Sequence, residues 1–132
     1  MTVGLVGRQI LIVEDEMVIA WLLTEMLDEL GCHVVGPVCT VGQALDAIDR
    51  ERFDAALLDV NLNGQFSYPV ADALAARSIP FMFSTGYDRS RIREGYRQMP
   101  MLQKPYHSTE LEKALTLMFA PDAGGQAAPI AA

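Results

Sequence analysis

The side chains best suited to chemistry in this 132-residue sequence are five polar or charged groups, each closely following a short apolar segment. They are Glu14, Asp15, Asp59, Thr85 and Lys104. Three are carboxylates, which repel one another at close range unless protons or a cation relieve their charge. Mg²⁺ prefers near-octahedral oxygen ligands and retains several waters. We therefore expect Asp15 and Asp59 to bind Mg²⁺ directly, together with the backbone carbonyl of Asn61, and Glu14 to act through water.

The elements that must position these residues can be predicted from periodicity. Continuous apolar residues at 55–58 indicate a strand that is buried on both faces. Five such segments alternate with helical periodicity, which predicts an α/β fold with one doubly wound parallel sheet, right-handed crossovers, helices on both faces and strand order 2-1-3-4-5. The predicted strands are 9–13, 33–38, 55–58, 78–84 and 100–103. The predicted helices are 17–30, 41–52, 69–77, 88–98 and 109–118.

The carboxyl ends of parallel strands form the edge at which ligands bind in open α/β sheets, so the five side chains should share one crevice. With Mg²⁺ on one phosphoryl oxygen, the ammonium of Lys104 and the hydroxyl of Thr85 could hold the other two. That arrangement suits in-line phosphoryl transfer, with Asp59 as the nucleophile.

Each of these residues also has an ordinary structural interpretation. Asp59 could cap the following turn, Thr85 could be a turn hydroxyl, and Lys104 could form a surface ion pair. The acidic residues 14–16 could form the first turn of a helix. The arrival of all five side chains at successive strand ends favours the functional interpretation.

Local signals refine the predicted elements. One apolar face of helix 17–30 includes Trp21 as a core residue, and Gly31 ends that helix. The remaining start signals are Thr40 as a cap, Pro69 at the first helical position and Ser108 as a cap. Segment 88–98 contains Gly95 and few apolar residues, so we expect a weak and mobile helix there. The Gly-Pro pair in strand 33–38 suits a sheet edge.

Composition restricts the class of protein. The length and the 51% hydrophobic content predict one globular domain, at 8–119, followed by a disordered tail at 120–132. The net charge of −7 argues against a direct nucleic-acid partner, and the arginines between 89 and 97 are expected to form a solvated face. No signal peptide or membrane-length apolar run is present, so we expect a cytoplasmic protein in which Cys32 and Cys39 are free thiols.

Four motifs together resemble the receiver domain of two-component response regulators. They are Val-Glu-Asp-Glu at 13–16, Leu-Leu-Asp-Val-Asn-Leu at 57–62, Ser-Thr-Gly-Tyr at 84–87 and Lys-Pro at 104–105. The resemblance covers about residues 8–119. It implies a flavodoxin-like (βα)5 fold, Mg²⁺ dependence and phosphorylation of Asp59 by a histidine kinase or a histidine phosphotransfer protein. It also implies that Thr85 is the switch hydroxyl, that Lys104 binds the phosphoryl group and that the peptide bond before Pro105 is cis.

The sequence departs from that family in two places. Met101 occupies a position where the family usually has an aromatic residue, which puts the usual coupling to the switch threonine in doubt. Gly86 follows Thr85 where the family commonly has Ala. The run 80–87 resembles a variant subfamily with a Phe-Ala-Thr-Gly-Tyr signature. In that subfamily Tyr87 would contribute to signalling, although it could equally be a tyrosine packed at the surface.

We therefore expect a single-domain response regulator, which is a signalling phospho-acceptor rather than an enzyme. With no DNA-binding segment after it, its output would be a protein partner or a phosphate sink or shuttle. The output face, and a possible homodimer, would involve helix 88–98, strand 100–103 and the last helix. An alternative is a degenerate receiver that acts as an interaction module without phosphorylation.

Two other classes fit the residues less well. An aspartyl-phosphate phosphohydrolase needs a second acid two positions after its nucleophile, and that position is Asn61, which cannot shuttle a proton. A nucleotide or flavin carrier needs a glycine-rich phosphate loop, and the sequence has neither pattern of that kind.

Overall fold

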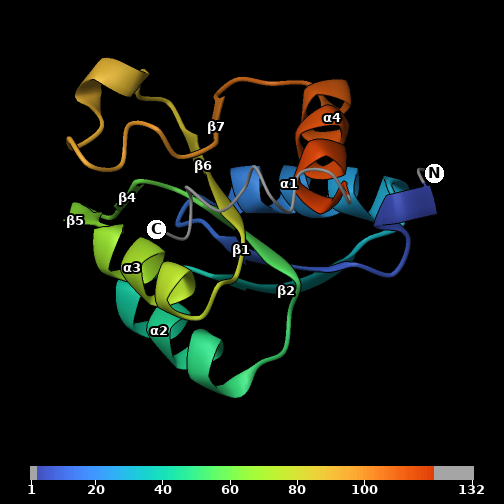
Figure 1. Cartoon of the computed structure of the whole chain (residues 1–132), viewed down its shortest axis with the longest axis horizontal. Coiled ribbons are helices and arrows are strands. Elements are labelled where there is room, and N and C mark those ends of the chain that lie inside the picture. Colours follow the sequence, from blue (N-terminus) through green and yellow to red (C-terminus); the bar gives the residue numbers. More distant parts are fainter. Residues whose placement is uncertain (1–2, 121–132) are drawn as a thin grey trace.

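The computed structural model describes residues 3–120, in which a parallel five-stranded sheet lies between two layers of helices (Figure 1). The strand order is β2-β1-β3-β6-β7, which confirms the predicted order. All four residues of β3 are buried, as expected for a central strand that is covered on both faces. The strands are β1 Gln9–Val13, β2 His33–Val38, β3 Ala55–Leu58, β6 Phe81–Thr85 and β7 Met101–Gln103.

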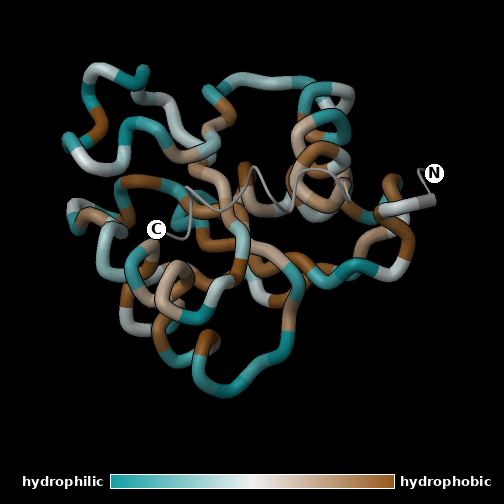
Figure 2. Tube along the Cα trace, viewed as in Figure 1, coloured by the Kyte–Doolittle hydropathy of each residue, from teal (hydrophilic) through white to brown (hydrophobic). Residues whose placement is uncertain are grey.

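Helices cover both faces of the sheet in the described residues. α1 and α4 pack on one face with the short 3-10 helix η1, and α2 and α3 pack on the other (Figure 1). Successive residues of β1 alternate between these two cores, and the central strands are among the most hydrophobic parts of the trace (Figure 2). The bounds are η1 Val3–Leu5, α1 Met17–Glu29, α2 Val41–Arg50, α3 Tyr68–Ala76 and α4 Ser108–Phe119.

Most predicted helix ends are confirmed. The Thr40 hydroxyl accepts a hydrogen bond from the Gln43 backbone at 3.0 Å, and Gly31 has a φ of 87° just after α1. Pro69 lies in the first turn of α3. The cap of α4 is one residue earlier than predicted, because its N-cap is His107 rather than Ser108. The Glu110 carboxylate accepts from the backbone N–H of His107 at 2.9 Å.

The predicted helix at 88–98 is wrong. This stretch contains only the three-residue 3-10 helix η2, Arg89–Arg91, followed by turns (Figure 1). Two arginines donate to backbone carbonyls in place of helical hydrogen bonds. Arg89 donates to the carbonyls of Arg97 and Met99, and Arg97 donates to that of Ile92. We call residues 87–100 the β6–β7 segment. The predicted output face therefore lacks one of its two helices.

The predicted buried face of α1 is wrong in its first half, although Leu27 and Leu30 are buried as predicted. Ala20, Leu23 and Leu27 face the sheet, whereas Trp21 is 61% exposed and Val18 is exposed as well. Residues 17–23 are almost all apolar, so the sequence offers several stripes of helical spacing, and packing on the sheet selects one of them. The sequence therefore did not reveal the apolar residues that α1 leaves at the surface.

Both cysteines are free thiols, as predicted, and Cys32 is buried. The Gly36–Pro37 and Lys104–Pro105 peptide bonds are both cis, and the resemblance implied the second. Within residues 3–120 no helix combines the length and apolar character needed to cross a bilayer. The tail predicted as disordered lies outside the described residues, apart from Ala120.

Candidate functional site

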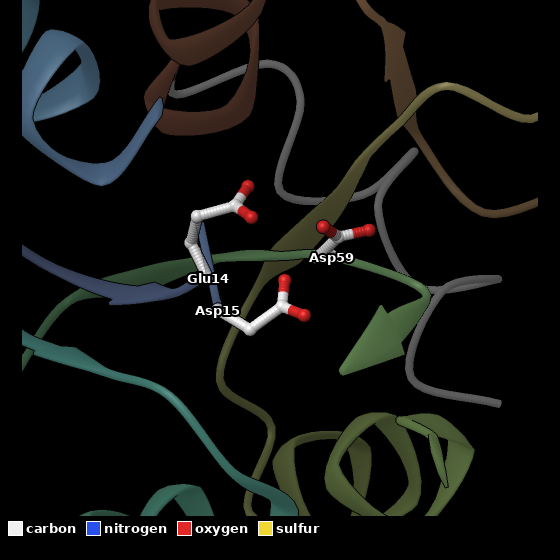
Figure 3. Close-up of side chains that lie close together, drawn as sticks. All are labelled: Glu14, Asp15 and Asp59. Carbon is white, nitrogen blue, oxygen red and sulfur yellow. The ribbon is translucent and has the colours of Figure 1, made fainter. Parts of the chain in front are cut away.

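Three carboxylates converge at the carboxyl ends of β1 and β3. Glu14, Asp15 and Asp59 each offer an oxygen within 4.8 Å of the others, and Figure 3 shows the three side chains around a common space. Glu14 is only 1% exposed, and Asp59 is also buried. Backbone pairing fixes them: the N–H of Asp59 donates to the Val13 carbonyl at 3.0 Å, and that of Glu14 donates to Val38 at 2.9 Å.

Lys104 is the cation that meets these acids. Its Nζ lies 2.6 Å from Glu14 Oε1 and 3.1 Å from Asp59 Oδ2. Its position follows from β-sheet pairing, since the N–H of Lys104 donates to the carbonyl of Thr85 at 2.7 Å. β7 thus delivers the ammonium to the ends of β1 and β3, across β6.

Burial controls the electrostatics of this cluster. Burial raises the pKa of Glu14 to about 7, and the nearby charge of Asp59 acts in the same direction, although the hydrogen bond from Lys104 opposes both. Burial alone would lower the pKa of Lys104, but hydrogen bonds and charges from Glu14 and Asp59 raise it above its usual value. Burial therefore disfavours the charged form of Glu14, and the Lys104 ammonium offsets only part of this effect.

A small hairpin between β3 and α3 completes the acid site. Its strands are β4, Asn61–Leu62, and β5, Gln65–Phe66. The N–H of Asn63 donates to Asp15 Oδ2 at 2.8 Å, and the N–H of Asn61 lies 3.4 Å from Asp59 Oδ1. Asn63 and Gly64 have positive φ values of 54° and 88°. An Asn-Gly pair is a strong hairpin signal, so residues 63–64 could have revealed this turn.

Thr85 and Tyr87 lie at the entrance to the site. The hydroxyl oxygen of Thr85 accepts a hydrogen bond from the backbone N–H of Tyr87 at 3.1 Å. A cleft of about 270 Å³ opens beside the carboxylates. Its lining includes most of the predicted site residues: Asp15, Asp59, Asn61, Thr85, Tyr87 and Lys104. Met101 lies outside this lining and packs against the core with α2 and α3.

The donor set fits a hard divalent cation. Two or three carboxylates and a nearby backbone carbonyl are the oxygen ligands that Mg²⁺ prefers, and the open cleft leaves room for waters and a phosphoryl oxygen. Neither a histidine nor a cysteine belongs to this group among the described residues, which argues against a site built for zinc.

A second, apolar cavity of about 160 Å³ lies between α1 and the chain that follows β7. It shares Lys104 with the acid cleft, and its other lining residues are Ile19, Leu22, Leu23, Met26, Pro105 and Tyr106. The Tyr106 hydroxyl lies 2.9 Å from that of Ser84, next to Thr85 in the chain. Leu22 is also one of the exposed apolar side chains in the first half of α1, which are Met17, Val18, Trp21 and Leu22.

Comparisons with known proteins identify the family that this chain resembles. Residues 10–116 match the model of the response regulator receiver domain. The transcriptional regulatory protein PdtaR of Mycobacterium tuberculosis is 29% identical over 116 residues, which is 85% of this chain and 57% of PdtaR. The chain thus spans little more than half the length of that relative.

Solved structures extend the agreement to three dimensions. SdrG from Sphingomonas melonis Fr1 is 47% identical, with a TM-score of 0.75, over 88% of this chain and 97% of SdrG. The BeF3-activated conformation of SdrG from Pseudomonas melonis Fr1 is 45% identical, with a TM-score of 0.76, over 87% of this chain and 98% of that one. The receiver domain of the sensor histidine kinase PA1611 from Pseudomonas aeruginosa PAO1 has magnesium coordinated in its active-site cleft. It is 30% identical, with a TM-score of 0.70, over 83% of this chain and 95% of that one.

Proposed function

This chain belongs to the response regulator receiver domain family, and from that we propose that it accepts a phosphoryl group on Asp59 from a phosphohistidine. The donor would be a histidine kinase or a histidine phosphotransfer protein, and this chain would act in the cytoplasm. The observation that carries the proposal is the position of Asp59. It is a buried carboxylate beside Glu14 and Asp15, and its Oδ2 lies 3.1 Å from Lys104 Nζ. A carboxylate so placed is suited to be a nucleophile, because the groups that stabilise the transferred phosphoryl group are already in position.

In the reaction, a carboxylate oxygen of Asp59 forms a bond to phosphorus while the bond from phosphorus to the donor imidazole nitrogen breaks. Bound Mg²⁺ would neutralise charge on the phosphoryl oxygens. Asp15, Asp59 and the backbone carbonyl of Asn61 would hold the ion directly, and Glu14 would act through water. Lys104, which contacts Glu14 and Asp59 at rest, would turn to a phosphoryl oxygen.

The switch would begin at Thr85. Its hydroxyl is engaged by the N–H of Tyr87, so a rotation toward the phosphoryl group breaks a contact that holds the first residue of the β6–β7 segment. Tyr87 would therefore move with the switch. This change would alter an output face made of the β6–β7 segment, β7 and α4, which could also support a homodimer.

We place the donor on the exposed apolar surface of α1. The apolar cavity beside α1 and the acid cleft share Lys104, so a helix bound along α1 would bring its histidine near Asp59. Met17, Val18, Trp21 and Leu22 are all exposed, and the fold does not need them in the core. Apolar side chains gathered beside a reaction site are typical of a binding surface for a protein partner.

The first experiment measures intact mass after incubation with acetyl phosphate, with and without Mg²⁺. The wild-type chain should gain one phosphoryl group only with Mg²⁺, and Asp59→Asn should gain none. Asp46→Asn is a matched control, because Asp46 is an exposed carboxylate on α2 that pairs with Arg50. No gain in the wild type, under conditions that label a control receiver, would support the alternative of a degenerate receiver. Release of inorganic phosphate over many turnovers would instead support a phosphohydrolase.

A second experiment tests the donor surface. The donor is the histidine kinase, within a panel, that labels the wild type fastest. Trp21→Ala should slow phosphoryl transfer from this kinase by about tenfold and leave labelling by acetyl phosphate unchanged. Leu117→Ala is the matched control, because Leu117 is equally exposed but lies on α4. Equal rates for Trp21→Ala and the wild type would show that the donor binds elsewhere.

A third experiment separates the two outputs. A phosphate sink should lower the phosphorylation of a second regulator by the same kinase even when the output face carries substitutions. An effector should lose its function in the same variants while it still accepts phosphate.

A further inference from the structure

Tyr68, at the start of α3, is an aromatic residue that joins three parts of the molecule. It is 3% exposed. Its ring stacks on Phe66 of β5 with centroids 5.6 Å apart and on Tyr96 of the β6–β7 segment at 4.5 Å. It also meets Phe83 of β6 edge to face at 6.3 Å. Such rings pack closely and cannot move independently, so a shift of one displaces the others.

The β4–β5 hairpin, on one side of Tyr68, is hydrogen-bonded to the acid site. Asn63 donates its N–H to Asp15 Oδ2 at 2.8 Å, and the Ser67 hydroxyl donates to the backbone carbonyl of Asp59 at 2.5 Å. Phe66 belongs to this hairpin, and Ser67 directly precedes Tyr68 in the chain. Any movement of Asp15 or Asp59 on metal binding or phosphorylation therefore acts on the hairpin that carries Phe66.

The β6–β7 segment on the other side is held by Tyr68 and by α3. The Tyr68 hydroxyl accepts a hydrogen bond from the Arg93 N–H at 2.9 Å, and the Arg93 guanidinium lies 4.4 Å from the centre of the Tyr68 ring. The Tyr96 hydroxyl donates to Asp72 Oδ1 of α3 at 2.5 Å. These contacts fix the central part of the segment in the absence of a regular helix.

We propose that Tyr68 couples the acid site to the β6–β7 segment through the β4–β5 hairpin, in parallel with the contact between Thr85 and Tyr87. The proposal rests on the proposed function, because phosphorylation or metal binding at Asp59 is the signal that the hairpin would transmit. Met101, a flexible side chain, packs against the same core as Tyr68. The hairpin and Tyr68 thereby give the molecule a second route to its output face.

The test compares backbone amide chemical shifts of residues 88–99 before and after beryllofluoride and Mg²⁺ are added to the whole chain. Phe66→Ala removes one ring of the stack at a side chain that is 44% exposed, so the fold should survive. In Phe66→Ala we expect a fluorine signal from bound beryllofluoride and a chemical-shift change at Thr85 as large as in the wild type. The shift changes of residues 88–99 should be at least twofold smaller than in the wild type. Val6→Ala, an exposed apolar position outside the proposed output face, should respond as the wild type does.

A second variant tests whether one route is involved. Tyr96→Leu should also weaken the response of residues 88–99, and the double variant with Phe66→Ala should be no weaker than the stronger single variant, because both substitutions break the same chain of contacts. A full response in Phe66→Ala, or additive losses in the double variant, would overturn the coupling role of Tyr68 while the site still binds its ligand. A wild-type chain without any bound fluorine signal would instead overturn the proposed function, and the coupling with it.

Discussion

The two halves of the functional edge of the sheet are held in different ways. At β1 and β3 the backbone ladder continues into the acids, since Asp59 and Glu14 both donate backbone hydrogen bonds to neighbouring strands. At β6 and β7 the ladder ends at Thr85 and Lys104, and side chains hold the intervening residues. Arg89 donates to two carbonyls, and Tyr96 donates to Asp72 of α3. Backbone pairing thus fixes Glu14, Asp59 and Lys104, whereas side-chain contacts hold the β6–β7 segment, which is one part of the proposed output face.

This difference assigns stability and response to separate regions. A paired and buried strand end moves only if the sheet itself opens, which keeps the three carboxylates and Lys104 in register. The β6–β7 segment is held by side-chain hydrogen bonds, stacked rings, local turns and the burial of Ile92, so it can rearrange without opening the sheet. The β6–β7 segment is therefore the part of the molecule expected to open locally before the sheet unfolds.

Two cavity-creating substitutions at equally buried positions test this difference between the sheet and the β6–β7 segment. Leu57 of β3 and Ile92 of the β6–β7 segment are both 1% exposed. Leu57→Ala should lower the free energy of unfolding by about 2–5 kcal/mol, because the sheet cannot collapse around the cavity. Ile92→Ala should lower it by only about 2 kcal/mol, because the segment can settle. Urea unfolding gives both values, and amide exchange should show lost protection at residues 88–99 in Ile92→Ala alone.

The control for both cavities is Val18→Ala, an exposed apolar side chain on α1, which should change the free energy of unfolding by about 0.5 kcal/mol or less. Equal losses in Leu57→Ala and Ile92→Ala, with uniform changes in exchange, would show that the β6–β7 segment and the sheet unfold as one unit.

The strand-held half of the site could be predicted from the sequence because its signals are local. A continuous apolar run such as 55–58 must be buried, and the next polar residue must lie at the strand end. The order of strands then follows from the connection rules, which bring Glu14, Asp59 and Lys104 to one edge. The 2.6 Å contact between Lys104 Nζ and Glu14 Oε1 agrees with this predicted convergence.

The side-chain-held half could not be predicted, because its contacts join residues with no periodic relation. The arginines of residues 89–97 have the spacing of a solvated helical face, yet Arg89 and Arg97 bind carbonyls and Arg93 covers Tyr68. Trp21 was misassigned for a related reason, since an almost wholly apolar stretch gives no unique inward stripe. The hairpin is an exception, because its Asn-Gly pair at residues 63–64 is a local signal in the sequence.

A smaller effect tests the role of Arg89. Arg89→Lys keeps the charge but loses the planar group that donates to the carbonyls of Arg97 and Met99. We expect a local loss of about 1 kcal/mol, which is roughly a fivefold faster amide exchange at residues 96–99, with unchanged exchange in β1 and β3. Arg91→Lys is the control, because the Arg91 guanidinium contacts the Tyr87 ring and donates to neither carbonyl. Equal exchange in both variants would remove Arg89 from the account of how the segment is held.

The smallest effect is a tyrosine titration that reports whether the β6–β7 segment is docked. Burial, followed by the hydrogen bond and charge of Asp72, raises the pKa of Tyr96 from 10.0 to about 12. Because the folded-state pKa exceeds the unfolded one, this tyrosine stabilises the fold fully below about pH 10, and its contribution is lost between about pH 10 and 12.

Asp72→Asn removes the negative charge but leaves most of the burial, so the pKa of Tyr96 should fall only part of the way toward 10. Tyrosine ring signals followed by NMR between pH 9 and 12.5 measure it. Tyr106, whose pKa is raised by burial beside Ser84 on the other face of the sheet, should not change and serves as the internal control. A wild-type Tyr96 that titrates near pH 10 would mean that the stack on Tyr68 is open in solution. The β6–β7 segment would then lack its main side-chain contact with α3, and the contrast between the two halves of the edge would become one between an ordered and a free segment.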